Sequence, residues 1–142
     1  MNNKPVIQKI VLAGVVLDNN KILIIKRNKN EKTYPKIWEL PSGKREVLES
    51  SEAALKREIK EETSLDIEII KLISVFDYVI EKENEFIDST QINFLVKAIN
   101  NHVVLSEEHE EFAWINKNDI SDYEITDKTK NVINEAFKFL NI

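Results

Sequence analysis

The residues of this chain best suited to chemistry are the acidic side chains between Gly43 and Leu65. Glu58, Glu61 and Glu62 lie close together, and their negative charges repel one another unless a cation lies between them. Carboxylate oxygens on a rigid element suit Mg²⁺, or Mn²⁺ in its place. Since the natural substrate of such a metal is a phosphate chain, the segment predicts a metal-dependent site for a phosphate-containing molecule.

A helix from Ser50 to about Thr63 is expected to carry these carboxylates. Ser50 can act as its N-cap by accepting a hydrogen bond from the first turn. Helical residues advance by about 100° each, so Glu58 and Glu62 lie one turn apart on one face. Glu61 falls on the neighbouring stripe, stacked on Glu58.

Most helices rich in glutamate and lysine are simply solvated, and that alternative applies to this segment as well. Two features favour a functional site. Gly43, just before the segment, allows a turn that places a loop over the helix. Glu49 can reach Arg57 and tie that loop down through a charged, bidentate pair.

The same segment resembles the signature box of the Nudix hydrolases, G-x5-E-x7-R-E-U-x-E-E-x-G-U, in which U is a bulky aliphatic residue. The matching residues are Gly43, Glu49, Arg57, Glu58, Ile59, Glu61, Glu62 and Leu65. Ser64 stands where the family usually has a glycine that ends the helix in a left-handed conformation, and serine there costs about 1 kcal/mol. Outside the box, Trp38-Glu39-Leu40-Pro41 is similar to the family's lead-in and Ala13-Gly14-Val15-Val16 to its first core strand.

The resemblance implies hydrolysis of a nucleoside diphosphate linked to another group, with Glu58, Glu61 and Glu62 as ligands of Mg²⁺. Glu58 is the first choice for the base that takes a proton from water, and Glu61 and Glu108 are further catalytic candidates. Gly43, Glu49 and Arg57 are assigned to anchoring the loop.

A downstream element, Glu108-His109-x-Glu111-x-x-Trp114-Ile115, is similar to one that brings another acid toward the metals. We prefer Glu108 to Glu111 for that role. His109 is as suited to a structural hydrogen bond as to catalysis.

Other candidates keep two interpretations. Lys26 and Arg27 could face the substrate phosphates or form a solvated strand end. Trp38 is more often a core residue than a base-stacking platform. Aromatic side chains that could stack a base or simply pack are Tyr34, Phe76 and Tyr78.

The elements expected around the acidic helix make residues 1–142 a single α/β domain. Strands are expected at 11–17 and 21–27, joined by the turn at 18–20, and at 37–40, 67–80, 86–99 and 112–115. Residues 41–43 are expected to form a turn, and a last helix to run from 127 to 140. This order favours a sheet sandwiched between helices. The resemblance makes it the Nudix fold, an α/β/α sandwich around a mixed β-sheet.

Composition limits the classes of function. The formal net charge of −5 disfavours nonspecific binding to nucleic acid, which depends on neutralising phosphates. The absence of cysteine excludes a disulfide framework and a thiolate metal site. We expect no signal peptide and no membrane span, and hence a cytoplasmic protein. Its expected partner is a small nucleotide, and we expect a monomer or a homodimer.

Three functions remain in order of preference. The first is hydrolysis of nucleoside triphosphates, including oxidised ones, to a monophosphate and pyrophosphate. It is favoured because no additional N-terminal domain for sugar-nucleotide sites is evident. The second is hydrolysis of ADP-ribose or a dinucleoside polyphosphate. The third, a non-catalytic nucleotide-sensing module, is disfavoured because all the glutamates of the box are kept.

Overall fold

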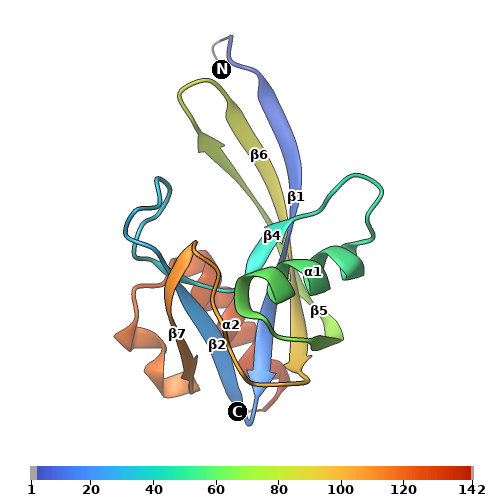
Figure 1. Cartoon of the computed structure of the whole chain (residues 1–142), viewed down its shortest axis with the longest axis vertical. Helices are drawn as coiled ribbons and strands as arrows, with labels where there is room; N and C mark the ends of the chain where they lie inside the picture. The colour runs from blue at the N-terminus through green and yellow to red at the C-terminus, as the bar shows by residue number, and fades with distance from the viewer. Residues whose placement is uncertain (1–2, 142) are drawn as a thin grey trace.

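A mixed seven-stranded sheet lies between two helices in the computed structural model, which describes residues 3–141 (Figure 1). The strands are β1 (Val6–Asp18), β2 (Lys21–Arg27), β3 (Trp38–Glu39), β4 (Ser42–Lys44), β5 (Ile67–Glu81), β6 (Phe86–Ala98) and β7 (His109–Ile115). The helices are α1 (Ser51–Thr63), the short 3₁₀ helix η1 (Lys117–Asp122) and α2 (Asp127–Phe139). No helix within residues 3–141 has the length and apolar character needed to cross a bilayer.

The central strand β1 sets the topology. It runs parallel to β6 and antiparallel to β2 and β4, and the main path of the sheet is β3-β2-β1-β6-β5. Strand β7 extends the sheet by pairing with β2. The expected mixed sheet is therefore confirmed.

Two apolar cores form because successive residues of a strand point to opposite faces. From β1, Leu12 and Val16 pack with Leu55 and Ile59 of α1 on one face. Val15 belongs to the core on the other face, with Phe137 of α2. One helix therefore covers each face, which confirms the α/β/α sandwich.

The acidic helix begins and ends as its sequence indicates. The hydroxyl of Ser50 accepts a hydrogen bond from the Ala53 amide at 3.1 Å, as expected of an N-cap. Ser64 follows the last turn with φ of 66°, in the left-handed region that usually favours glycine. Its hydroxyl donates to the carbonyl of Val104 at 3.0 Å, which ties the end of α1 to the segment that follows β6.

The prediction of a turn at residues 41–43 is wrong for Ser42 and Gly43, because Ser42–Lys44 forms strand β4. Ser42, Gly43 and Lys44 pair with Ala13, Leu12 and Val11 of β1. The Pro41 carbonyl also accepts from the Gly14 amide at 3.0 Å, so the backbone is already in the sheet before Gly43. This pairing presses Gly43 against α1.

The N-terminal half of β1 extends the sheet beyond the helices. Strand β1 begins at Val6 rather than at residue 11, because β6 continues the parallel pairing from Phe86 onward. Together with the last residues of β5 and the first residues of β6, it forms an arm that projects past α1 (Figure 1). One face of this arm adjoins the site described below.

Candidate active site

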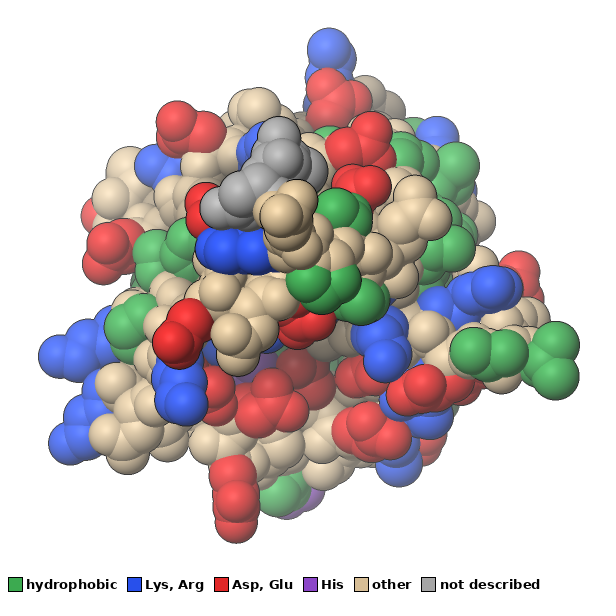
Figure 2. All heavy atoms as spheres, turned by 90° about the horizontal axis from the view of Figure 1, so that it is seen from above, with side chains coloured by type: hydrophobic (Ala, Val, Ile, Leu, Met, Phe, Trp, Pro, Cys, Tyr) green, Lys and Arg blue, Asp and Glu red, His purple; other side chains and the backbone are tan. Residues whose placement is uncertain are grey.

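A cleft of about 630 Å³ opens beside the arm and brings together residues from most of the sheet and the start of α2. Four of its residues are acidic: Glu39 of β3, Glu62 of α1, Glu108 just before β7, and Asp127 at the start of α2. Figure 2 shows acidic side chains gathered in a hollow on the face seen from above. The molecule thus collects negative charge that is dispersed along the sequence.

Glu62 is the most deeply placed of these carboxylates. Its exposure is only 7%, and Oε1 accepts a hydrogen bond from the Ser42 amide at 2.8 Å. Burial raises the pKa of Glu62 well above its usual range; the bond from Ser42 opposes the rise, and the charges of Glu39, Glu108 and Glu58 add to it. The carboxylates of the cleft are therefore close enough to interact.

Glu58 lies directly over Gly43. A Cβ at position 43 would lie only 2.0 Å from the Glu58 carboxylate, so a side chain there would occupy the place of that group. Burial raises the pKa of Glu58; hydrogen bonding and charge from Arg57 oppose this, and the charges of Glu61 and Glu108 add to it. Gly43 is thus the residue that admits Glu58 to the edge of the cleft.

Arg57 ties the loop before α1 to the helix. Its Nε and Nη2 donate to the two carboxylate oxygens of Glu49 at 2.7 and 2.9 Å, which is the bidentate pair expected from the sequence. Nη2 also donates to the Lys44 carbonyl, and Nη1 to Glu58 at 2.8 Å. The hydrogen bonds from Arg57 are the main reason that the pKa of Glu49 falls to about 2. The pair holds the Glu49 loop and Glu58 in place together.

The remaining candidates on α1 and β2 lie differently. Glu61 is exposed, and its nearest partner is Arg57 Nη1, 3.4 Å from Oε2. Arg27 lines the cleft, where Nη1 lies 3.4 Å from Glu39 Oε2 and Nε donates to the Thr33 carbonyl. Lys26 instead pairs with Glu111 at 3.2 Å, outside the cleft. The structure brings only Arg27 of these two basic residues to the carboxylates.

The position of Glu108 depends on the chain that follows β6. The amides of Val104 and Ser106 donate to the carbonyls of Thr63 and Glu62, so this segment runs along the end of α1. Glu108 then lines the cleft, whereas Glu111 lies on β7 opposite Lys26. Of the two acids, Glu108 is the one near Glu62.

Glu39 and His109 form a contact that sequence reasoning missed. His109 is buried, and its Nε2 lies 2.8 Å from Glu39 Oε2. Glu39 was noted only as part of the segment that precedes Pro41, with no role in the site. Its neighbours Trp38 and Leu40 are apolar, and this alternation is the signal that could have pointed to a carboxylate facing the cleft.

Aromatic side chains form another wall of the cleft. Tyr34, Trp38, Phe76 and Tyr78 all line it, and the Phe76 and Tyr78 ring centroids lie 5.9 Å apart. Lys128 Nζ lies 5.1 Å from the Phe76 centroid. Trp38 also packs edge-on against Tyr123 at 4.9 Å, so its ring serves both the core and the cleft.

Comparison with known proteins agrees with this fold. A family model described as NUDIX domain matches residues 8–136. The chain therefore belongs to the Nudix family, and it is a pyrophosphohydrolase.

Particular relatives are similar over most of the chain. A protein named nucleoside triphosphatase NudI from Enterobacter sp. is 25% identical over 131 residues, 87% of this chain and 92% of the relative. A protein named 8-oxo-dGTP diphosphatase from Buchnera aphidicola is 25% identical over 130 residues, 92% of this chain and 94% of the relative. A MutT NUDIX hydrolase from Burkholderia pseudomallei superposes with a TM-score of 0.77 at 25% identity, covering 90% of this chain and 97% of that structure.

Nudix hydrolases generally use a divalent metal, and the donors here suit one. Within residues 3–141, no three His, Asp or Glu side chains are already gathered around one point in the way that would hold an ion. Arg57 engages Glu58 and Glu61 instead. The carboxylates nevertheless fit a hard cation, because Gly43 leaves room for Glu58, and burial followed by the charges of neighbouring carboxylates raises the pKa of Glu62.

Proposed function

We propose that this protein hydrolyses nucleoside triphosphates, including oxidised ones, to a nucleoside monophosphate and pyrophosphate. The oxygen of water bonds to the α-phosphorus, the bond from that phosphorus to the oxygen bridging to the β-phosphate breaks, and one proton is released. The observation that carries the proposal is that Glu39, Glu62 and Glu108, from three separate parts of the chain, line one cleft with an aromatic wall.

In this proposal Glu58, Glu61 and Glu62 hold Mg²⁺, and Mn²⁺ can substitute for it. The bound ion would neutralise the diphosphate and make water a better nucleophile near neutral pH. Glu58 takes the proton of the attacking water, and Glu108 is the alternative base.

The remaining residues position this machinery. Glu49 and Arg57 hold the loop that carries Gly43 onto α1. Arg27, in contact with Glu39 at the cleft, is retained as a candidate for contact with a phosphate. Lys26 is not, because Glu111 engages its amine away from the carboxylates.

Two further features support a triphosphate as the substrate. The cleft volume of about 630 Å³ lies in the range usual for small-molecule sites. The relatives named nucleoside triphosphatase and 8-oxo-dGTP diphosphatase align with this chain over nearly their whole length.

The test is product release with Mg²⁺ across nucleoside triphosphates, 8-oxo-dGTP, ADP-ribose and dinucleoside polyphosphates. We expect monophosphate and pyrophosphate from a triphosphate, and at least about 100-fold lower turnover in Glu62→Gln, because the substitution removes charge from the metal site. The matched control is Glu111→Gln, which removes a carboxylate outside the cleft. Turnover of ADP-ribose alone would overturn the substrate assignment, and nucleotide binding with no turnover anywhere would identify a sensing module.

A further inference from the structure

Four lysines line the same cleft; Lys128 lies over the ring of Phe76, and the other three form a group of interacting charges. Lys9 lies on β1, Lys44 on β4, and Lys82 directly after β5. Lys44 directly follows Gly43, the residue that contacts Glu58, so these lysines lie next to the carboxylates. The cleft therefore has an acidic part and a basic part side by side.

Within the part of the chain that the structure describes, Lys9, Lys44 and Lys82 have no carboxylate partner. Among the ion pairs formed within residues 3–141, the lysines that take part are Lys4, Lys26 and Lys60. Lys9 is only partly exposed, and burial lowers its pKa, with the charges of Lys82 and then Lys44 lowering it further. Three positive charges that repel one another, one of them partly desolvated, are unfavourable unless an anion joins them.

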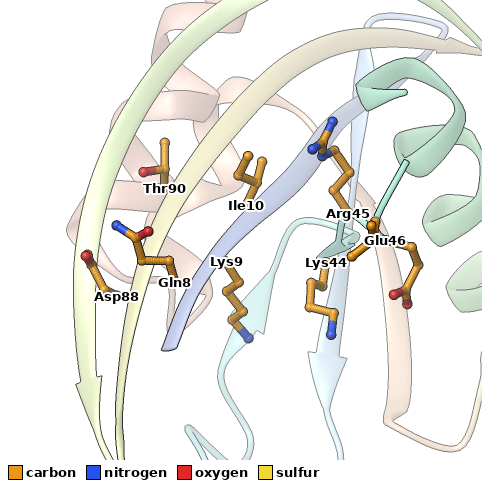
Figure 3. A pocket seen from close by; sticks show the side chains of 9 residues that line it. Gln8, Lys9, Ile10, Lys44, Arg45, Glu46, Asp88 and Thr90 are labelled. Atoms are coloured by element: carbon orange, nitrogen blue, oxygen red, sulfur yellow. The ribbon is translucent and has the colours of Figure 1, made fainter. Parts of the chain in front are cut away.

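The view from the other side of β1 shows how two of these side chains are arranged. A second hollow of about 470 Å³ lies there, and Lys9 and Lys44 line both hollows. Figure 3 shows their side chains extending to the same side, while Gln8 and Ile10 lie on either side of Lys9 along β1. The two amines are thus set together at the boundary between the hollows, and Lys9 also interacts with Lys82.

We propose that Lys9, Lys44 and Lys82 bind the terminal phosphates of the substrate, the part that leaves as pyrophosphate. This inference rests on the proposed hydrolysis of nucleoside triphosphates and names the feature that would select them. Amines are strong donors to phosphate oxygens, and three of them match a leaving group with several negative charges. A substrate that carries a sugar in place of the terminal phosphates would gain much less from this site.

The first experiment measures binding of inorganic tripolyphosphate by calorimetry in EDTA, so that no metal contributes. We expect the Lys9→Ala/Lys82→Ala double variant to bind tripolyphosphate at least about tenfold more weakly than the unaltered protein. Lys21→Ala is the matched control, because Lys21 is an exposed lysine of β2 that pairs with Asp18, at the end of β1 far from Lys9. Equal affinity in the double variant would overturn the proposal.

The second experiment separates this inference from the proposed function. With Mg²⁺ and a nucleoside triphosphate, the double variant should show KM raised at least about tenfold and a weaker inhibition by pyrophosphate, with kcat changed much less. Any turnover of ADP-ribose should be nearly the same in both proteins. If the unaltered protein turns over no triphosphate, the proposed function fails. If it does and the variant keeps the same KM and the same pyrophosphate inhibition, only the lysine site fails.

Discussion

At the scale of single residues, the site depends on carboxylates that are placed where their charge is unfavourable. Burial is the first cause of the raised pKa of both Glu62 and Glu58, and their negative neighbours add to it. A divalent cation would reverse this situation, because opposite charge favours the ionised carboxylates. The free protein therefore carries a local instability that metal binding would relieve.

Replacing Gly43 with alanine tests the contact that admits Glu58. The new Cβ would lie 2.0 Å from the Glu58 carboxylate, which sits at the end of a flexible side chain and can move away. We expect the variant to stay folded and to lose at least about tenfold in turnover with Mg²⁺, since the proposed base is displaced.

Gly14→Ala is the control for this substitution, since the chain has two glycines and both contact α1. A Cβ at position 14 would meet Ile59 Cδ1 in the core at 2.6 Å, so this variant should lose about 1–3 kcal/mol of stability through overpacking. Thermal unfolding and turnover measured together check both results. Full activity in Gly43→Ala would show that Glu58 does not act from the observed position.

Glu62→Gln should change the pH dependence of stability in the metal-free protein. Because the pKa of Glu62 is raised in the folded state, the unfolded chain releases this proton first as the pH rises above about 4.5. The free energy of unfolding therefore falls between that pH and the pKa of the folded state. Glutamine can still accept from the Ser42 amide but does not titrate, so the variant should lose less stability over this range.

Urea unfolding in EDTA at pH 4.5 and pH 7.5 measures this effect. The variant should gain stability relative to the unaltered protein at pH 7.5, with a smaller difference at pH 4.5. Parallel curves at the two pH values would contradict the raised pKa. Glu111→Gln, which changes an exposed carboxylate, should track the unaltered protein.

At the scale of elements, α1 is the part that its sequence predicts best. Local signals fix both ends, with Ser50 as the N-cap and Ser64 in the left-handed conformation at the position that is usually glycine. The spacing of Glu58 and Glu62 then follows from helical geometry alone. The Glu49–Arg57 pair was also predictable, since charge and box spacing both point to it.

The strands show where sequence reasoning stops. Of Lys26 and Arg27, only Arg27 lines the cleft, and the pairing of β2 with β7 has a register irregularity between these two residues. The choice depends on the pairing of β2 with β7, which places Glu111 opposite Lys26. Ser42 and Gly43 were expected to form a turn with Pro41, and the pairing of Ser42–Lys44 with β1 is a long-range interaction that local residue preferences do not reveal.

Ser64 provides a test of helix termination with a matched pair of variants. Both Ser64→Gly and Ser64→Ala lose the hydrogen bond from the hydroxyl to the Val104 carbonyl, but only glycine adopts φ of 66° without steric cost. We expect the glycine variant to be more stable than the alanine variant by about 1 kcal/mol. Chemical unfolding of the two side by side measures the difference. Equal stability would mean that α1 ends differently in solution.

At the scale of the whole molecule, the fold assembles the site from distant segments. Glu39 comes from the edge strand β3, Glu62 from α1, and Glu108 from the segment that leads into β7. Strands β3 and β7 both pair with β2, which is why Glu39 and His109 meet although they are 70 residues apart in the sequence. This proximity was beyond sequence reasoning, because it depends on the order of strands in the sheet.

The most direct test of the central claim, that Glu58, Glu61 and Glu62 form a metal centre, is a titration of the protein with Mn²⁺ followed by electron paramagnetic resonance. We expect saturable Mn²⁺ binding in the unaltered protein, binding at least about tenfold weaker in Glu62→Gln, and unchanged binding in Glu111→Gln. The unaltered protein should also gain thermal stability on adding the metal. Saturable binding of the same affinity in all three proteins would contradict this claim, as would the absence of specific binding in the unaltered protein.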